Sequence, residues 1–178
     1  MNRYDKIVRI IVGGSHPEAK IVHWNCRTLR NGMKNDLAKM HLLNNLKAII
    51  ISLNETNGQL KKSKTHNIFE ELPAVTKRPG QLKYNAALMV DHRLKTIEVK
   101  RKVNYVSVVV SNLSLIGSEI LVASAYCRPQ EAIINQWQET LLDFDEDVKN
   151  AARLYGVKRF VLLGDLNVER KILQNRLS

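Results

Sequence analysis

Three apolar runs of this sequence each end in polar residues, and these are the candidate residues of a functional site. They are Asn25 after IVHW, Glu55 after AIIISLN, and Asp165 with Asn167 after RFVLLG. Core strands are rigid and the loops after them are exposed, so α/β proteins tend to assemble sites at strand ends. Two carboxylates and two amides offer hard oxygen ligands and neutral hydrogen-bond donors, which suit Mg²⁺ or Mn²⁺ and a phosphate rather than zinc. Taken singly, a residue such as Glu55 or Asp165 is a turn or capping residue about as often as it is a site residue.

The elements that must hold these residues follow from the hydrophobic pattern. Short β-branched or apolar runs predict buried strands over 21–25, 48–53 and 159–163. Apolar residues three apart predict an amphipathic helix over 35–47. Steps of three or four define a longer helical stripe over 131–155, and Gly156 stands where a left-handed C-cap belongs. The pattern indicates a mixed α/β protein with helices packed over sheets.

The remaining segments complete the predicted order of elements. Residues 1–20 are expected to form an N-terminal extension, and 57–83 a long polar loop. Strands over 86–91 and 94–99 predict a hairpin, followed by strands over 103–110 and 119–126 joined through a turn at Gly117. We expect these four strands to be antiparallel.

Composition limits the class of protein. The 178 residues are 44% hydrophobic, which suits one domain with its own core. No run approaches the roughly 18 apolar residues of a membrane helix, and the start of the chain has too short an apolar run for a signal peptide. Cys26 and Cys127 are too few for a disulfide framework or a cysteine-based zinc site. We expect an intracellular protein, in the nucleus if it acts on DNA.

The positive charge is unevenly distributed. The net charge is +11, and residues 1–102 carry 20 basic against 8 acidic side chains. Clusters at 61–64 and 100–102 would release counterions from nucleic-acid phosphates if they share a face. The alternative is a set of solvated lysines that maintain solubility. Arg27, Arg30 and Arg128 follow the candidate site residues closely and are candidate contacts to backbone phosphates, or exposed arginines that cover apolar surface.

Five blocks in order carry a family resemblance: IVHWNCRTL, AIIISLNET, YNAALMVDHRL, LVASAYCRP and VLLGDLNVE. Together they resemble the endonuclease/exonuclease/phosphatase superfamily, and the WNCR wording resembles the apurinic/apyrimidinic-endonuclease-like domain of non-LTR retrotransposons. The resemblance implies a DNase I-like fold over 21–178, a mixed two-sheet sandwich flanked by helices. It implies a metal-dependent phosphodiester hydrolase that nicks DNA.

The resemblance also implies roles for individual residues. Glu55 would bind Mg²⁺ or Mn²⁺, and Asn25 would help to organise the metal and the phosphate. Asp165 would orient or deprotonate the attacking water. Asn167 would hydrogen-bond the phosphate, and Tyr126 would assist the developing charge beside the scissile group.

The sequence departs from the family pattern near its end. Members of the superfamily continue past the GDLN block to an Asp-His pair, but all five histidines here precede that block. We therefore expect a domain that is incomplete at the C-terminus and lacks its last strands. It is either a piece of a longer protein that continues into a reverse transcriptase or a degenerate copy, and loss of the Asp-His pair would inactivate it. A non-catalytic nucleic-acid-binding remnant and a phosphatase of the same fold are the alternatives.

Overall fold

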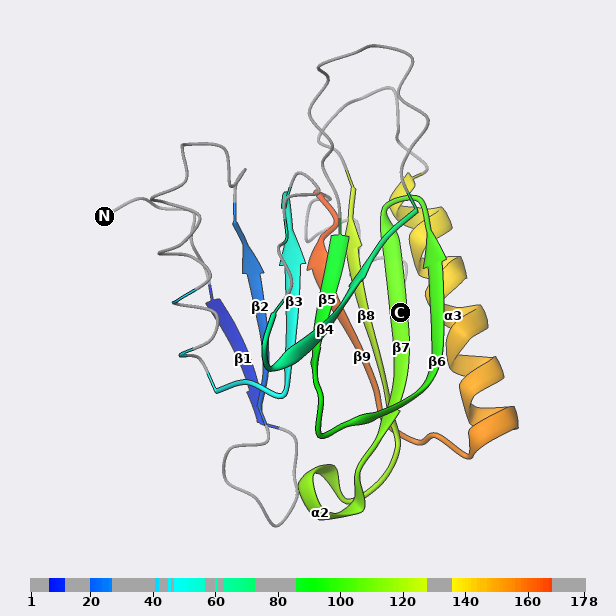
Figure 1. Ribbon diagram of the computed structural model, residues 1–178. Coiled ribbons are helices and arrows are strands. Elements are labelled where there is room, and N and C mark those ends of the chain that lie inside the picture. The colour runs from blue at the N-terminus through cyan, green and yellow to red at the C-terminus, as the bar shows by residue number, and fades with distance from the viewer. Residues whose placement is uncertain are drawn as a thin grey trace.

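The protein is represented by a computed structural model that describes residues 7–11, 20–26, 41, 45, 47–56, 60, 63–72, 86–127 and 136–167. Two sheets pack face to face, and one long helix lies against the outer face of the second sheet (Figure 1). The strands are β1 (Ile7–Ile11), β2 (Lys20–Asn25), β3 (Ile50–Asn54), β4 (His66–Glu70), β5 (Ala86–Asp91), β6 (Lys95–Lys102), β7 (Tyr105–Ser111), β8 (Ile120–Tyr126) and β9 (Phe160–Asp165). The helices whose bounds both lie within the described residues are α2 (Leu113–Ile116) and α3 (Gln136–Tyr155).

The strand order gives each sheet one parallel pair. The first sheet, called sheet A, runs β1-β2-β3-β5-β4, and only β2 and β3 are parallel within it. The second, sheet B, runs β6-β7-β8-β9 with β8 and β9 parallel. This mixed α/β, two-sheet architecture confirms the predicted fold class. No helix in the described part of the chain is long and apolar enough to cross a membrane.

Alternation along the strands divides the apolar residues between layers. Ile21 of β2 and Val122 of β8 belong to the cluster between the two sheets. Trp24 packs with Ile51 on the other face of sheet A. On the outer face of sheet B, Val109 and other side chains pack against the apolar stripe of α3. The period of two in the strands and the three-to-four spacing in α3 thus account for all three layers.

Buried polar contacts fix α3 to sheet B. Asp147 of α3 is 2% exposed, and its carboxylate accepts hydrogen bonds from Lys100 at 2.8 Å, Tyr105 at 2.7 Å and Ser107 at 2.6 Å. The helix ends as predicted at Gly156, whose φ is +67°. Because a buried carboxylate needs partners, this cluster sets the rotation of α3 over the sheet.

Two predicted segments differ from the structure. The predicted 86–91/94–99 hairpin is wrong, because β5 pairs with β3 and β4 whereas β6 pairs with β7 in the other sheet. The predicted polar loop over 57–83 contains strand β4, an edge strand whose apolar residues pack against both core layers. Alternation identifies a strand but does not choose its partner, which explains the first error.

The N-terminal part of the chain also departs from expectation. Residues 7–11, expected within an extension, form β1 and pair antiparallel with β2. Of the helix predicted over 35–47, His41 and Asn45 are helical, and the remainder up to residue 46 lies outside the described residues. The part of the long helix before residue 136 lies outside them as well.

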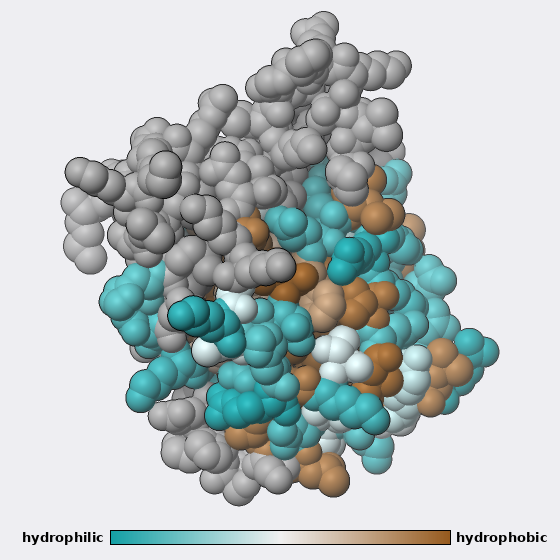
Figure 2. Space-filling view, viewed as in Figure 1, coloured by the Kyte–Doolittle hydropathy of each residue, from teal (hydrophilic) through white to brown (hydrophobic). Residues whose placement is uncertain are grey.

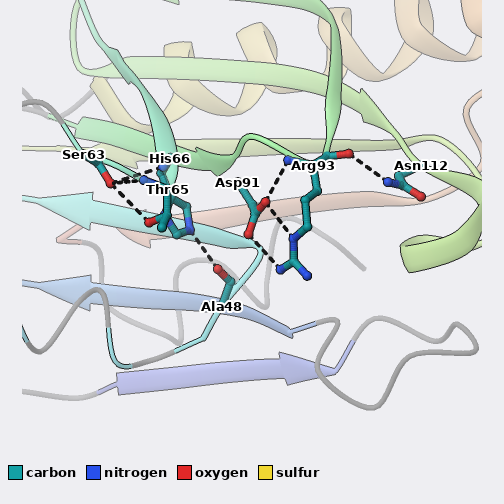
Figure 3. A network of polar contacts seen from close by, with 7 residues as sticks. All are labelled: Ala48, Ser63, Thr65, His66, Asp91, Arg93 and Asn112. Carbon is teal, nitrogen blue, oxygen red and sulfur yellow. Dashed lines mark hydrogen bonds and ion pairs between the residues drawn. The ribbon is translucent and has the colours of Figure 1, made fainter.

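A polar turn carries the chain from sheet A to sheet B (Figure 3). The Asp91 carboxylate accepts from the Arg93 main-chain N–H at 2.8 Å and from its guanidinium at 2.8 and 3.0 Å, and the Arg93 carbonyl accepts from Asn112 at 2.8 Å. Nearby, the His66 ring contacts the carbonyl of Ala48 at 2.9 Å. Burial alone would raise the pKa of the Asp91 carboxyl, but Arg93 outweighs it and holds this pKa below its ordinary value. This turn separates β5 from β6.

Candidate active site

The carboxyl ends of four strands meet at one end of the sandwich. Asn25 ends β2 and is the register partner of Asn54, the last residue of β3. Tyr126 ends β8 and is the register partner of Asp165, the last residue of β9. Residues in register on paired strands point to the same face. The two parallel pairs, one in each sheet, therefore present their last side chains to the same end of the molecule.

A single amide joins the two carboxylates of this site. The Asn25 Nδ2 donates to Glu55 Oε1 at 3.0 Å and to Asp165 Oδ2 at 3.2 Å. Asn25 and Asp165 are 140 residues apart, and they come from different sheets. The convergence expected from the three strand ends is therefore present. A neutral donor between two carboxylates also reduces their mutual repulsion.

Asp165 is held on several sides. Its Oδ1 accepts from the main-chain N–H of Asn167 at 3.1 Å. Its own N–H donates to the side-chain oxygen of Asn54 at 3.0 Å, and its carbonyl accepts from Cys127 N–H at 2.9 Å. Both carboxylate oxygens thus have a hydrogen bond to an uncharged donor, which orients the group without neutralising it.

The backbone of the site adopts conformations that most residues avoid. Glu55 has φ of +58° and Asn167 has φ of +49°. Left-handed conformations cost of order 1 kcal/mol or more for residues other than glycine and are found often at functional sites. Gly164 has φ of +143°, and a Cβ there would lie 2.0 Å from the carbonyl oxygen of Ala125. The glycine of the GDLN block is therefore required by the close approach of β8.

The other predicted site residues take varied positions. Tyr126 is 3% exposed and lies in the inter-sheet cluster beside Asp165. The Asn167 amide group donates to the Cys127 carbonyl at 2.5 Å, so in this structure it binds the end of β8. Three further predictions, Arg27, Arg30 and Arg128, lie outside the described residues.

Buried polar groups beneath the site were not identified from the sequence. The His23 ring contacts Ser52 Oγ at 2.9 Å, and that hydroxyl donates to Ser124 Oγ at 2.8 Å, which links sheet A to sheet B. Burial lowers the pKa of His23, although the nearby Asp165 carboxylate partly offsets this. Asn54, fully buried, is the second such link. Period-two alternation along β3 could have placed Ser52 and Asn54 on one face, but not their partners.

The three basic side chains at 100–102 do not all lie on one face of β6. Lys102 contacts Asp143 of α3 at 2.6 Å, and this hydrogen bond raises the pKa of the lysine. Lys100 is likewise bound to Asp147. Arg101 lies on the opposite side of β6, 5.9 Å from the ring of Phe69. Among the residues coloured in Figure 2, hydrophilic side chains predominate and apolar ones gather near the middle of this face. The expectation of a joint phosphate-binding cluster is therefore wrong for these two lysines, because α3 supplies their counter-charges.

The donor set suits a hard divalent cation. The described residues contain no group of three or more His, Cys, Asp or Glu side chains placed to hold a metal ion. Glu55 and Asp165, however, have oxygens within 3.2 Å of the same nitrogen. Mg²⁺ commonly takes only one or two carboxylates and completes its octahedron with water and substrate phosphate. Two carboxylates and an amide at strand ends fit that requirement.

Comparison with solved structures identifies the fold class. By sequence, the chain matches no family model and no curated protein. It is similar to TDP2 from C. elegans, with TM-score 0.58 and 15% identity over 85% of this chain and 48% of that one. It is similar to the endonuclease domain of TRAS1, a telomere-specific non-LTR retrotransposon, with TM-score 0.56 and 21% identity over 86% and 61%. For ANGEL2, a 2′,3′-cyclic phosphatase, the values are 0.55 and 13% over 74% and 43%.

These likenesses establish that the chain has a DNase I-like fold. The structural neighbours include nucleases and phosphatases of that fold. The chain spans about half the length of the TDP2 structure, 48%. One scaffold hosts several chemistries, so the reaction has to be argued from the site itself.

Proposed function

We propose that this chain is a phosphodiester hydrolase domain that nicks DNA, an endonuclease of the retrotransposon type. The observation that carries the proposal is the Asn25 amide hydrogen-bonded to both Glu55 and Asp165 across the two sheets. The likeness to the TRAS1 endonuclease domain supports the substrate class. The net charge of +11 favours a polyanionic partner.

The chemistry requires charge neutralisation and an oriented nucleophile. A phosphodiester repels hydroxide, and a divalent cation, when bound, would offset the phosphate charge and lower the pKa of a bound water. Glu55 and Asn25 would hold that cation by their oxygens. Asp165 would accept a proton from the attacking water, since its carboxylate is fixed by Asn25 and the Asn167 main chain.

Two further residues would act on the phosphate. Tyr126, which ends β8 in register with Asp165, would assist charge that develops at the scissile group. Asn167 would hydrogen-bond the phosphate after its amide leaves the Cys127 carbonyl. Arg27, Arg30 and Arg128 stay predictions as contacts to backbone phosphates.

A plasmid-nicking assay tests the proposal. Conversion of supercoiled to open-circular DNA is measured in Mg²⁺ for the wild type, Asp165→Asn and Asp145→Asn. Asp145 is a matched control because its carboxylate is on the exposed side of α3, paired with Lys149. We expect nicking that stops in EDTA, falls at least about 100-fold in Asp165→Asn and is unchanged in Asp145→Asn. Nicking that survives Asp165→Asn, or a wild type with no metal-dependent nicking, would refute the assignment.

A phosphatase of the same fold is the second candidate, favoured by the likeness to ANGEL2. Faster hydrolysis of small phosphomonoesters or cyclic phosphates than of plasmid DNA would select it. A non-catalytic binding role is distinguished by DNA affinity that falls with salt in the absence of any hydrolysis. A downstream reverse transcriptase and a nuclear location stay predictions.

A further inference from the structure

Asn54 connects the three loops that carry the proposed site. Its side-chain oxygen accepts from the Asp165 N–H at 3.0 Å, and its Nδ2 donates to the Leu53 carbonyl at 3.2 Å. Its own carbonyl accepts from the Cys26 N–H at 3.1 Å and from the Cys26 thiol at 2.8 Å. The residue is fully buried. It therefore contacts the residue after Asn25, precedes Glu55 in the chain, and binds Asp165.

The bond to Asp165 crosses between the sheets. Asn54 ends β3 of sheet A, Asp165 ends β9 of sheet B, and 111 residues separate them. Glu55 follows directly in a left-handed conformation with φ of +58°. The Asn54 side chain thus connects the end of β3, which precedes Glu55, to the end of β9, which carries Asp165. Because this hydrogen bond joins the fully buried Asn54 side chain to the Asp165 main chain, the amide also fixes the position of Asp165.

Resting on the proposed function, we propose that Asn54 is a positioning residue that sets the spacing between the Glu55 and Asp165 carboxylates. It touches neither substrate nor reacting atoms. It holds the Asp165 main chain at the distance where Asn25 can bond both carboxylates. Loss of the amide would let the end of β9 move away from β3. The spacing between the Glu55 and Asp165 carboxylates would then no longer suit a divalent cation and a phosphate bound side by side.

A second hydrogen bond between the sheets, made by the residue two positions before Asn54, provides a matched control. Ser52 lies on the same face of β3, and its hydroxyl bonds Ser124 of β8 at 2.8 Å. This second link is also buried and also joins sheet A to sheet B. No hydrogen bond connects Ser124 to Asp165 among the contacts of the described residues. Ser124→Ala therefore removes an inter-sheet link without removing the support of Asp165.

Amide exchange and kinetics test the proposal together. We expect the Asp165 amide hydrogen to exchange at least about tenfold faster in Asn54→Ala and at the wild-type rate in Ser124→Ala. In the plasmid-nicking assay, kcat should fall about 10- to 100-fold in Asn54→Ala with KM within about twofold, the size seen when a residue that orients a site group is removed. Ser124→Ala should stay within about threefold of the wild type. An equal fall in both variants would indicate a merely structural link and overturn the proposal.

A measurement on the wild-type protein covers the case in which Asn54→Ala does not fold. A scalar coupling across the hydrogen bond, from the Asp165 nitrogen to the Asn54 side-chain carbonyl carbon, is expected by NMR. Absence of that coupling overturns the proposal. If the wild type hydrolyses no phosphodiester, the proposed function fails, whereas the exchange and coupling data still decide whether Asn54 holds Asp165.

Discussion

Replacement of Gly164 by alanine is the sharpest perturbation of the strand that carries Asp165. A Cβ at this position would lie 2.0 Å from the Ala125 carbonyl oxygen and 2.8 Å from the carbonyl carbon. Contacts under 3.0 Å are essentially never observed for real Cβ atoms, and the neighbour here is backbone. The end of β9 must therefore shift by about 1 Å, a displacement that can cost about 100-fold in rate when it affects a reacting group.

The expected loss of stability has two parts. The Gly164 φ of +143° belongs to a region that only glycine occupies readily, and strain of this kind costs about 1–3 kcal/mol. The clash with β8 adds to it. For a domain of this size each kcal/mol lowers Tm by roughly 2–4 °C, so the strain alone should lower Tm by roughly 2–12 °C, and the clash should lower it further.

Gly156→Ala is the matched control in the assay. Gly156 also has positive φ, +67°, but a Cβ there meets nothing within 4 Å. Gly156→Ala should lower the free energy of unfolding by about 1 kcal/mol, from the left-handed strain alone, and Tm by roughly 2–4 °C. Thermal unfolding by circular dichroism and plasmid nicking are measured for both variants. Equal Tm values and equal nicking rates for the two variants would refute the inference that β9 packs too closely against β8 at Gly164 to admit a side chain.

Three further predictions concern charged side chains outside the candidate site. Asp147→Ala should lower the free energy of unfolding by about 3 kcal/mol in urea titrations, because it leaves a lysine and two hydroxyls without their shared acceptor. The lowered pKa of Asp91 contributes stability that is present above pH 3.8 and lost as pH falls further, so the destabilisation caused by Arg93→Gln should shrink below that pH. Lys102→Gln should leave the salt dependence of DNA binding unchanged, since Asp143 already neutralises this lysine; a shallower slope would show that it reaches a phosphate.

The sequence was sufficient to predict the elements that carry the site. The strands β2, β3 and β9 are short apolar runs closed by a polar residue, and strand ends of this type converge in α/β folds. The helix α3 follows from its three-to-four spacing and from Gly156. These patterns are local, and a local pattern predicts the folded structure correctly when burial and propensity favour the same element.

Features that depend on distant partners could not be predicted in this way. The sheet to which β6 belongs is decided by the Asp91–Arg93 turn and by pairing with β7, neither of which alternation reveals. Asn54 looks like an ordinary polar residue before Glu55 until its partner, 111 residues along the chain, is known. The charge at 100–102 is visible in the sequence, whereas the α3 carboxylates that neutralise two of its members are not.

We propose that Asn25, Glu55 and Asp165 form one site, in which Glu55 and Asn25 hold a divalent cation and Asp165 accepts the proton of the attacking water beside it. Paramagnetic broadening by Mn²⁺ tests it directly, because the effect on each NMR signal depends on its distance from the bound ion. We predict that substoichiometric Mn²⁺ broadens the backbone amide signals of these three residues and the Asn25 side-chain signal, and that excess Mg²⁺ restores them. The signals of Asp91 and Asp147, carboxylates paired elsewhere, should stay sharp. Broadening centred on those residues, or spread evenly over the protein, would contradict the account.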